Sequence, residues 1–323
     1  MTKRKRQPRR PTTAGVIVCL VCGVLLAAAS YLIDAFGGLY GLPGWEQLYA
    51  WLGIPMDTPS AEMLQTGDAT VTFFDVGQGD SVLIACGEDT CLIDAGTPDA
   101  ADSLVAALQT AGVRRLDYLV MTHPHADHIG GMAEIVQQFE IGQVLFAPLP
   151  DSLIPTTRTY EELLDAIAAK GLSITAASPG MTFSLGDGAQ ITILGPVGEF
   201  DDLNNASIVF RLDFGQTAFL FTGDAEAPSE DAILDRFGGE AVAAQVLKLG
   251  HHGSDTSSQE KWLNAVSPLL AVAEVGYDNS YGHPSPQTVE RLDVREIPLL
   301  RTDQDGTIVV VSDGESLSVS TEK

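Results

Sequence analysis

The chain is short of basic residues, histidine and cysteine, and each shortage narrows its interpretation. Its 323 residues include 18 Lys and Arg against 43 Asp and Glu, with six His and four Cys. Six of the basic residues lie in the first ten positions, so the rest of the chain has twelve basic and 43 acidic residues, a formal charge of −31. A body this acidic repels polyanions, which excludes tight nonspecific DNA binding by charge alone.

The remaining composition is that of a globular protein. Hydrophobic residues make up 45% of the chain and charged residues 19%, with 32 Gly and 17 Pro. These values exclude a disordered or collagen-like chain, and four cysteines are too few for a disulfide-stabilised scaffold of this length. The length suits one large domain or two ordinary ones.

Residues 14–33 (AGVIVCLVCGVLLAAASYLI) contain no charged side chain. As a helix, twenty residues would rise about 30 Å, the thickness of a bilayer's hydrocarbon core. We therefore predict a basic cytoplasmic tail (1–13), a single membrane anchor (14–34), a Gly- and Pro-rich stalk (35–68) and an extracytoplasmic domain (69–323), oriented by the positive-inside rule. A signal peptide cleaved near Ala27 and Ala29 is the alternative, and it would make the protein secreted. A buried core helix is disfavoured directly after six basic residues.

Two of the cysteines, Cys86 and Cys91, flank a four-residue segment between two strand-like runs. A four-residue hairpin loop would place their thiols face to face, which predicts a disulfide that an extracytoplasmic location permits. The alternative is a pair of free, partly buried thiols.

From Thr70 onward, short strand patterns alternate with helical ones, with helices expected near 101–111, 129–139 and 229–237. This mixture of hairpins and βα units predicts an α/β domain of helices packed on mixed sheets. Residues 149–160 (LPDSLIPTTRTY) are interpreted as a loop that overhangs the functional site.

All six histidines fall in three short segments: THPHADHIGG (122–131), LGHHGS (249–254) and YGHPS (281–285). In the first, Pro124 keeps the residues after a hydrophobic strand out of a helix, so the histidines occupy a loop at the strand end. His123 and His125 then point to one side, and Asp127 with His128 to the other. Imidazoles and a carboxylate in this spacing predict a site for two metal ions.

Several motifs together resemble the metallo-β-lactamase superfamily and, within it, the soluble domain of ComEC-type DNA-uptake proteins. They are FFDVGQGDS (73–81), LIDAG (92–96), THPHADHIGG (122–131), NNAS (204–207), FTGD (221–224), LKLGHHGS (247–254) and NSYGHPS (279–285). The resemblance implies an αββα sandwich with a metal site at one edge of its two sheets, and it implies hydrolysis.

The resemblance also implies the site residues. His123 and His125 would bind the first metal, Asp127 and His128 the second, and Asp224 would bridge both. One of His251 and His252 would complete the second site, and we favour His252 as ligand with His251 contacting substrate. Asp94 would orient the histidine loop from beneath, as metal-binding histidines usually require. Asp75 and Asp80 are interpreted as residues that rigidify their loop.

The chain departs from many members of the superfamily, because it has no histidine between His128 and His251. The NNAS segment stands in the place of a third histidine for the first metal. Asn205 would offer a carboxamide oxygen there or hold a water, which makes Mn²⁺ plausible beside Zn²⁺ and disfavours β-lactam hydrolysis. The alternative for Asn204 and Asn205 is a plain turn before a strand.

Two divalent ions sharing Asp224 would activate a bridging water for hydrolysis without a protein nucleophile. His283 would protonate the leaving group or bind a substrate oxygen, unless it caps the helix that follows Pro286. Lys248 would contact a phosphate, or it would be a solvated strand residue between Leu247 and Leu249.

The leading prediction is a membrane-anchored, extracytoplasmic phosphodiesterase that acts on phosphodiester substrates including DNA. The chain lacks a polytopic channel region, so it would not itself carry DNA across a membrane. Its acidity favours a small or transiently held substrate, which keeps a phosphocholine ester or a lactone as alternative substrates. A non-catalytic binding module is a third hypothesis, which the set of potential metal ligands disfavours. The sequence does not identify a protein partner.

Overall fold

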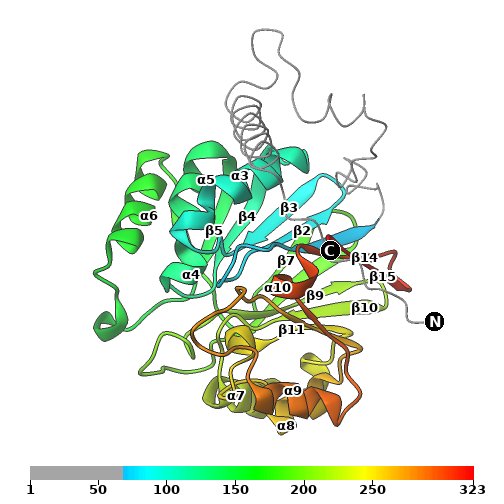
Figure 1. Ribbon diagram of the computed structural model, residues 1–323. Coiled ribbons are helices and arrows are strands. Elements are labelled where there is room, and N and C mark those ends of the chain that lie inside the picture. The colour runs from blue at the N-terminus through cyan, green and yellow to red at the C-terminus, as the bar shows by residue number, and fades with distance from the viewer. Residues whose placement is uncertain (1–67) are drawn as a thin grey trace, which may run out of the picture. The chain divides into compact units, whose positions relative to one another are not determined.

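Two β-sheets packed face to face form the centre of the described part of the chain, residues 68–323 of a computed structural model, and helices cover both outer surfaces (Figure 1). The predictions for the cytoplasmic tail, the anchor and nearly all of the stalk lie outside these described residues. Within residues 68–323, none of the helices combines the length and apolarity needed to cross a bilayer.

The first sheet runs in the order β15-β14-β1-β2-β3-β4-β5-β6. Its strands are antiparallel from β15 to β3 and parallel from β3 to β6. Their bounds are β1 Ala69–Phe73, β2 Val82–Cys86, β3 Asp89–Ile93, β4 Arg115–Met121, β5 Glu140–Phe146, β6 Ile174–Ala176, β14 Ile308–Ser312 and β15 Leu317–Thr321.

The second sheet runs in the order β13-β12-β11-β10-β9-β8-β7. Its strands are antiparallel from β7 to β10 and parallel from β10 to β13. Their bounds are β7 Thr182–Leu185, β8 Ala189–Gly195, β9 Val209–Phe214, β10 Thr217–Phe221, β11 Val246–Lys248, β12 Leu270–Ala273 and β13 Leu299–Arg301.

The helices divide between the two outer faces (Figure 1). On the first sheet lie α3 Ala101–Thr110, α4 Ala126–Ile129, α5 Met132–Gln138 and α6 Arg158–Ala169. On the second lie α7 Ala227–Phe237, α8 Glu260–Val266 and α9 Pro286–Asp293, while the short α10 Thr302–Asp305 follows β13. The arrangement is the αββα sandwich that the motifs imply.

The apolar residues of the strands explain this layering. Phe73, Ile84, Phe210 and Phe219 are fully buried in the cluster between the two sheets. Alternate residues such as Leu83 pack outward against the helices instead. Both faces of the central strands are therefore covered, and each large apolar side chain contributes about 1.5–3 kcal/mol to the free energy of folding.

The predicted helices near 101–111 and 229–237 correspond to α3 and α7, while the helix expected over 129–139 is divided. Gly130 and Gly131 separate α4 from α5, and a Cβ at Gly130 would lie 2.3 Å from the backbone nitrogen of Pro98. The glycine therefore permits a close approach of two backbones. The expected loop at 149–160 is only partly correct, because α6 begins at Arg158 with the Thr157 side chain accepting from Tyr160 N.

The predicted disulfide is wrong. The β2–β3 register pairs Cys86 with Asp89 and Ile84 with Cys91, so the hairpin loop has two residues rather than four. The cysteines are therefore diagonal neighbours, and their Cα atoms are about 7–8 Å apart, too far for a bridge. Both thiols are free and buried, and burial raises the pKa of Cys91.

Candidate metal centre

The histidine segments meet at one edge of the sandwich, where several strands end. The segment 122–128 follows β4, Asp224 follows β10, and His251 with His252 follows β11. Residues 274–285 follow β12 and bring His283 to the same place. Because neighbouring strands end at one edge of each sheet, residues far apart in the sequence become neighbours here.

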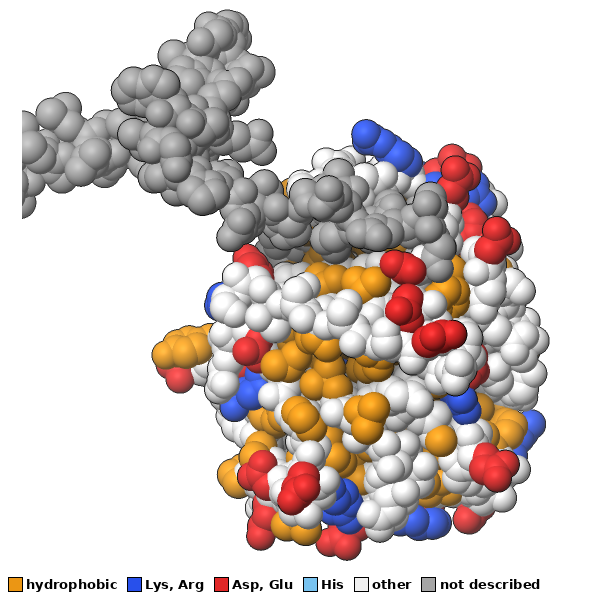
Figure 2. Space-filling view, turned by 90° about the vertical axis from the view of Figure 1, so that its right-hand side faces the viewer, with side chains coloured by type: hydrophobic (Ala, Val, Ile, Leu, Met, Phe, Trp, Pro, Cys, Tyr) orange, Lys and Arg blue, Asp and Glu red, His pale blue; other side chains and the backbone are white. Residues whose placement is uncertain are grey.

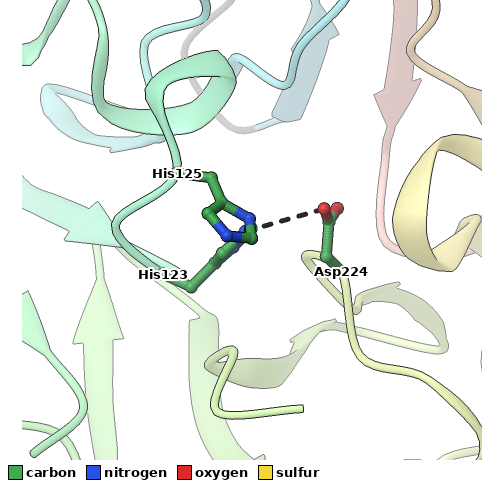
Figure 3. Close-up of side chains that lie close together, drawn as sticks. All are labelled: His123, His125 and Asp224. Carbon is green, nitrogen blue, oxygen red and sulfur yellow. Dashed lines mark hydrogen bonds and ion pairs between the residues drawn. The ribbon is translucent and has the colours of Figure 1, made fainter. Parts of the chain in front are cut away.

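A first group of potential metal ligands consists of His123, His125 and Asp224 (Figure 3). Each offers one ligand atom, and these atoms lie within 4.8 Å of one another. His123 Nε2 is 2.9 Å from His125 Nδ1 and 3.6 Å from Asp224 Oδ2. These are the residues expected around the first metal.

A second group consists of Asp127, His128 and His252, with ligand atoms again within 4.8 Å of one another. His252 Nε2 lies 3.4 Å from Asp127 Oδ2. Asp224 Oδ1 lies 3.3 Å from His128 Nε2 and 3.7 Å from His252 Nε2. Asp224 thus turns one oxygen toward each group, as a bridging carboxylate would.

Three polar atoms of these groups have no hydrogen-bond partner among the described residues, although they are buried: His128 Nε2, His252 Nε2 and Asp224 Oδ1. Leaving a buried polar atom unpaired costs about 1–3 kcal/mol, so such atoms normally have a partner. Two ring nitrogens and a carboxylate oxygen that converge in this way fit a divalent cation.

The electrostatics of the second group also favour a cation. Burial opposes a charge on His128, but Asp224, Asp94 and Asp80 outweigh it and raise its pKa well above the ordinary value. Burial likewise opposes a charge on His252, and Asp224 with Asp80 raises its pKa to about 10. The buried carboxylates therefore attract positive charge strongly, and a divalent ion would take the place of these protons.

Asp94 contacts the histidine loop from beneath. Its side chain is fully buried and accepts hydrogen bonds from the backbone and the hydroxyl of Thr122. Its Oδ2 also lies 2.8 Å from His128 Nδ1. A carboxylate at Nδ1 directs Nε2 toward the ligand group, which is the orienting contact predicted for Asp94.

Lys248 is placed differently from either prediction. Its side chain is 2% exposed, forms an ion pair with Asp80 and donates to the carbonyl of Gly223 at 3.0 Å. It neither reaches the cavity described below nor faces solvent. The reason is that Leu247 and Leu249 pack on the helix-covered face of β11, while Lys248 alternates with them and shares the face of Val246, which the other sheet covers.

Asp80 contacts the site, and the sequence interpretation did not predict this contact. Beyond its ion pair with Lys248, its Oδ1 lies 3.1 Å from His252 Nδ1, and the carbonyl of Glu274 accepts from that nitrogen at 2.9 Å. Asp80 thus contacts one of the potential ligands. Its place at the end of the DVGQGD segment, directly after Gly79, is the only sequence signal for this contact.

The prediction for Asn205 is wrong. Its Oδ1 accepts from the backbone of Glu226 and Ser229 at the start of α7, and its Nδ2 donates to Asp202. The carboxamide is therefore fully used in holding a helix N-terminus and has no lone pair directed at a metal. The neighbouring Asn204 lines the cavity instead, with a buried Oδ1 that lacks a hydrogen-bond partner among the described residues.

The two adjacent histidines have different surroundings. His252 is 2% exposed and belongs to the second ligand group, whereas the His251 side chain is 26% exposed. His251 Nδ1 lies 2.9 Å from Glu226 Oε1. Both residues adopt left-handed backbone angles, with φ of 47° and 54°, a strained conformation that is typical of functional sites.

His283 lies beside His251 at the cavity wall, with ring centroids 5.4 Å apart. Burial, together with the nearby histidines, lowers its pKa to about 4, so its ring is neutral at pH 7. The capping alternative is wrong, because Ser285 rather than His283 accepts from Thr288 N at the start of α9.

Both ligand groups border a cavity of about 300 Å³. Among the described residues 68–323, those that line it include no Lys or Arg: Gln78, His125, Ala126, Asp127, Asn204, Asp224, His251, His252, Tyr281 and His283. Residues 149–160 do not line it, so the predicted overhang is wrong; Leu149 and Pro150 border a separate cavity of about 160 Å³. On the face shown in Figure 2, Lys and Arg side chains lie scattered among acidic ones.

Comparisons with known proteins agree with this site. Residues 74–273 match the family described as the metallo-beta-lactamase superfamily. Competence protein ComA of Neisseria gonorrhoeae is 36% identical over 88% of this chain and 38% of its own length. ComE operon protein 3 of Bacillus subtilis is 29% identical over 75% of this chain and 33% of its own length, and Recombination protein 2 of Haemophilus influenzae is 29% identical over 69% and 26%. The chain thus spans about a third of the length of these relatives.

Proposed function

This chain belongs to the metallo-beta-lactamase superfamily, whose fold implies a metal-dependent hydrolase, and we propose that it is a binuclear metallophosphodiesterase that accepts DNA. The observation that carries the proposal is Asp224, which turns one carboxylate oxygen to each of two ligand groups at the border of an open cavity. Two ligand groups that share a carboxylate would hold two divalent ions, and two-metal sites commonly catalyse in-line displacement at phosphorus.

The substrate class rests on the similarity to proteins named for competence and recombination. The ligands are mixed imidazole and carboxylate, which suits Zn²⁺ and also Mn²⁺. The anchor at 14–34 remains part of the proposal, and it would hold the hydrolase domain on the outer side of the cytoplasmic membrane, where incoming DNA is available.

The residues of the chain would have distinct tasks in the reaction. Two divalent ions held by the two ligand groups would supply Lewis acidity and would lower the pKa of the attacking water. Asp94 holds His128, and the carbonyl of Glu274 holds His252 with Asp80 beside it, so the nitrogens that face the ligand groups keep their directions. Asp127 and Asp224 contribute negative charge that balances the ions.

The cavity wall supplies the groups that meet the substrate. Because His251 Nδ1 donates its hydrogen bond to Glu226, the Nε2 atom can take a proton or a hydrogen bond within the cavity. His283, which is neutral at pH 7, contacts a substrate oxygen by donating a hydrogen bond rather than by transferring a proton from an imidazolium. Asn204 can donate or accept with its carboxamide.

The proposal is tested with the full chain reconstituted with Mn²⁺ or Zn²⁺. Hydrolysis of bis(p-nitrophenyl) phosphate and of single- and double-stranded DNA is compared with that of Asp127→Ala. Cleavage by the intact protein and a loss of at least a hundredfold in the variant support the proposal. If the metal-loaded protein leaves every phosphodiester intact, the proposal is wrong.

One observation favours a second candidate, the hydrolysis of an ester with less charge than DNA. No Lys or Arg of the described part of the chain lines the cavity, whereas sites for polyanions usually present basic side chains. A phosphocholine ester or a lactone would need no such side chain. Turnover of either substrate by a metal-loaded protein that leaves phosphodiesters of DNA intact would establish this alternative.

A further inference from the structure

Tyr281 is a large aromatic side chain that the fold leaves open to solvent at the rim of the cavity. It is 69% exposed, although an apolar ring of this size normally packs against other residues. It also lines the cavity that borders the two ligand groups. The mechanism described above gives this ring no task.

The loop that carries Tyr281 is held firmly in place. Asn279 donates from Nδ2 to the carbonyls of Gly276 and His283, and its Oδ1 accepts from the backbone of His283. The backbone of Gly276 in turn donates to Gln78 Oε1. The ring is therefore presented by a loop that one asparagine closes, so little conformational freedom would be lost when a ligand stacks on it.

A row of rings leads from Tyr281 to the ligand groups. The ring of Tyr281 is nearly parallel to that of His283, with an interplanar angle of 25° and centroids 5.8 Å apart. His283 contacts His251 edge to face, and His251 Nε2 lies 3.8 Å from Asp224 Oδ2. A planar group on the outer side of Tyr281 would extend this row away from the ligand groups.

The charge of the cavity restricts what that planar group can be. Without Lys or Arg in its lining, the cavity can hold a nucleic acid only through the ions and through contacts to uncharged parts of the substrate. Stacking of a base on an aromatic side chain contributes about 1–3 kcal/mol and needs no positive charge. A cationic headgroup would instead require several rings arranged around it, and Tyr281 presents a single open face.

We propose that Tyr281 is a stacking platform for an unpaired nucleobase adjacent to the scissile phosphodiester, so that the site selects single-stranded nucleic acid. This inference rests on the proposed phosphodiesterase function and names the part of the substrate that this site would recognise. Bases paired within a duplex do not offer a free face, which is why the preference is for single strands or frayed ends.

The test compares the hydrolysis of two decamers by the full chain loaded with Mn²⁺. The decamers are dT10 and a decamer of abasic tetrahydrofuran residues, which have the same phosphodiester backbone. The wild type is expected to cleave dT10 with a higher kcat/KM. Tyr281→Ala should lower kcat/KM for dT10 by about 5- to 150-fold, mainly through KM, and leave the abasic decamer within twofold. Tyr281→Phe, which keeps the ring, should restore the preference.

Tyr277→Ala is the matched control, because Tyr277 lies on the same loop, is 83% exposed and does not line the cavity. It should behave as the wild type does. A second readout is the fluorescence anisotropy of labelled dT10 bound to Asp127→Ala, where adding Tyr281→Ala should weaken binding by a similar factor.

The outcomes separate the two proposals. If the wild type cleaves both decamers equally, or if Tyr281→Ala affects both equally, the stacking role is wrong while the phosphodiesterase stands. If the wild type cleaves neither decamer nor bis(p-nitrophenyl) phosphate, the phosphodiesterase is wrong, and the stacking role is rejected with it. Cleavage of a phosphocholine ester in place of DNA would likewise reject the proposed stacking of a nucleobase on Tyr281.

Discussion

Lys248 and Asp80 form an ion pair beneath the candidate metal centre, with side chains that are only 2% and 4% exposed. Burial opposes the charge on Lys248, but Asp80 and Asp224 raise its pKa, and burial opposes the charge on Asp80 while Lys248 lowers its pKa. Both groups are therefore charged, and Lys248 balances a carboxylate that contacts His252.

Removing one partner of this pair should be strongly destabilising. Lys248→Met leaves Asp80 as an unbalanced buried charge, and we expect the free energy of unfolding to fall by about 3–5 kcal/mol. The measurement is urea denaturation followed by circular dichroism.

The double variant Lys248→Met with Asp80→Asn should recover part of that loss, because no buried charge then lacks a partner. Lys261→Met is the control, since its ion pair with Asp231 is exposed and should contribute less than about 1 kcal/mol. A loss for Lys248→Met no larger than that for Lys261→Met would contradict the assignment.

His251 and His252 should differ in metal binding. Because His252 belongs to a ligand group and His251 lies at the cavity wall, His252→Ala should reduce the bound metal from two ions to about one per chain. His251→Ala should keep both ions and lower activity. Elemental analysis after dialysis against limiting Mn²⁺ or Zn²⁺ measures the stoichiometry, and the reverse pattern would exchange the two assignments.

The pH dependence of stability should report on Glu230, which lies outside the candidate metal centre. Burial raises its pKa to about 7, against the backbone amides of Gln259 and Ser258, which lower it. The folded state holds this proton more tightly than the unfolded state does. The contribution of Glu230 to the free energy of unfolding is therefore largest below pH 4.5 and falls between pH 4.5 and 7. The loss amounts to about 3 kcal/mol.

Glu230→Gln cannot ionise, so this variant should lack that part of the slope. Urea midpoints at half-unit steps from pH 4.5 to 7.5 provide the measurement. If wild type and variant give parallel curves over this range, the carboxyl group is not protonated in the folded protein.

The ligand groups could be predicted from the sequence because they are carried by short motifs. The spacing from His123 to His128 alone places four polar side chains at one strand end, and Asp224 directly follows a hydrophobic strand. The alternation of hairpins and βα units predicts helices packed on mixed sheets, while the αββα order of the layers is implied by the resemblance to the metallo-β-lactamase superfamily.

What the sequence did not show depends on which face of an element is covered. Lys248 alternates with leucines in a pattern equally typical of a solvated strand, and it is buried because the other sheet covers its face of β11. The Cys86–Cys91 hairpin was misjudged because register is decided by the turn, here two residues instead of four. Tyr281 lies in the NSYGHPS motif, but the sequence predicted no task for it, and its exposure is visible only in three dimensions.

Asn204 and Asn205 provide the last prediction, because adjacent asparagines should have separate effects. Asn205 holds two backbone amides at the start of α7, so Asn205→Ala should lower the free energy of unfolding by about 1–2 kcal/mol. Asn204 lines the cavity with an unpaired Oδ1, so Asn204→Ala should change stability by less than about 0.5 kcal/mol and lower kcat/KM.

Urea denaturation and phosphodiester hydrolysis, measured on both variants of this asparagine pair, separate the two roles. Metal content gives a further check, because neither variant removes a residue of a ligand group, so both should still bind two ions per chain. If Asn205→Ala loses a metal ion while its stability is unchanged, Asn205 is a ligand after all and its contacts to α7 contribute little.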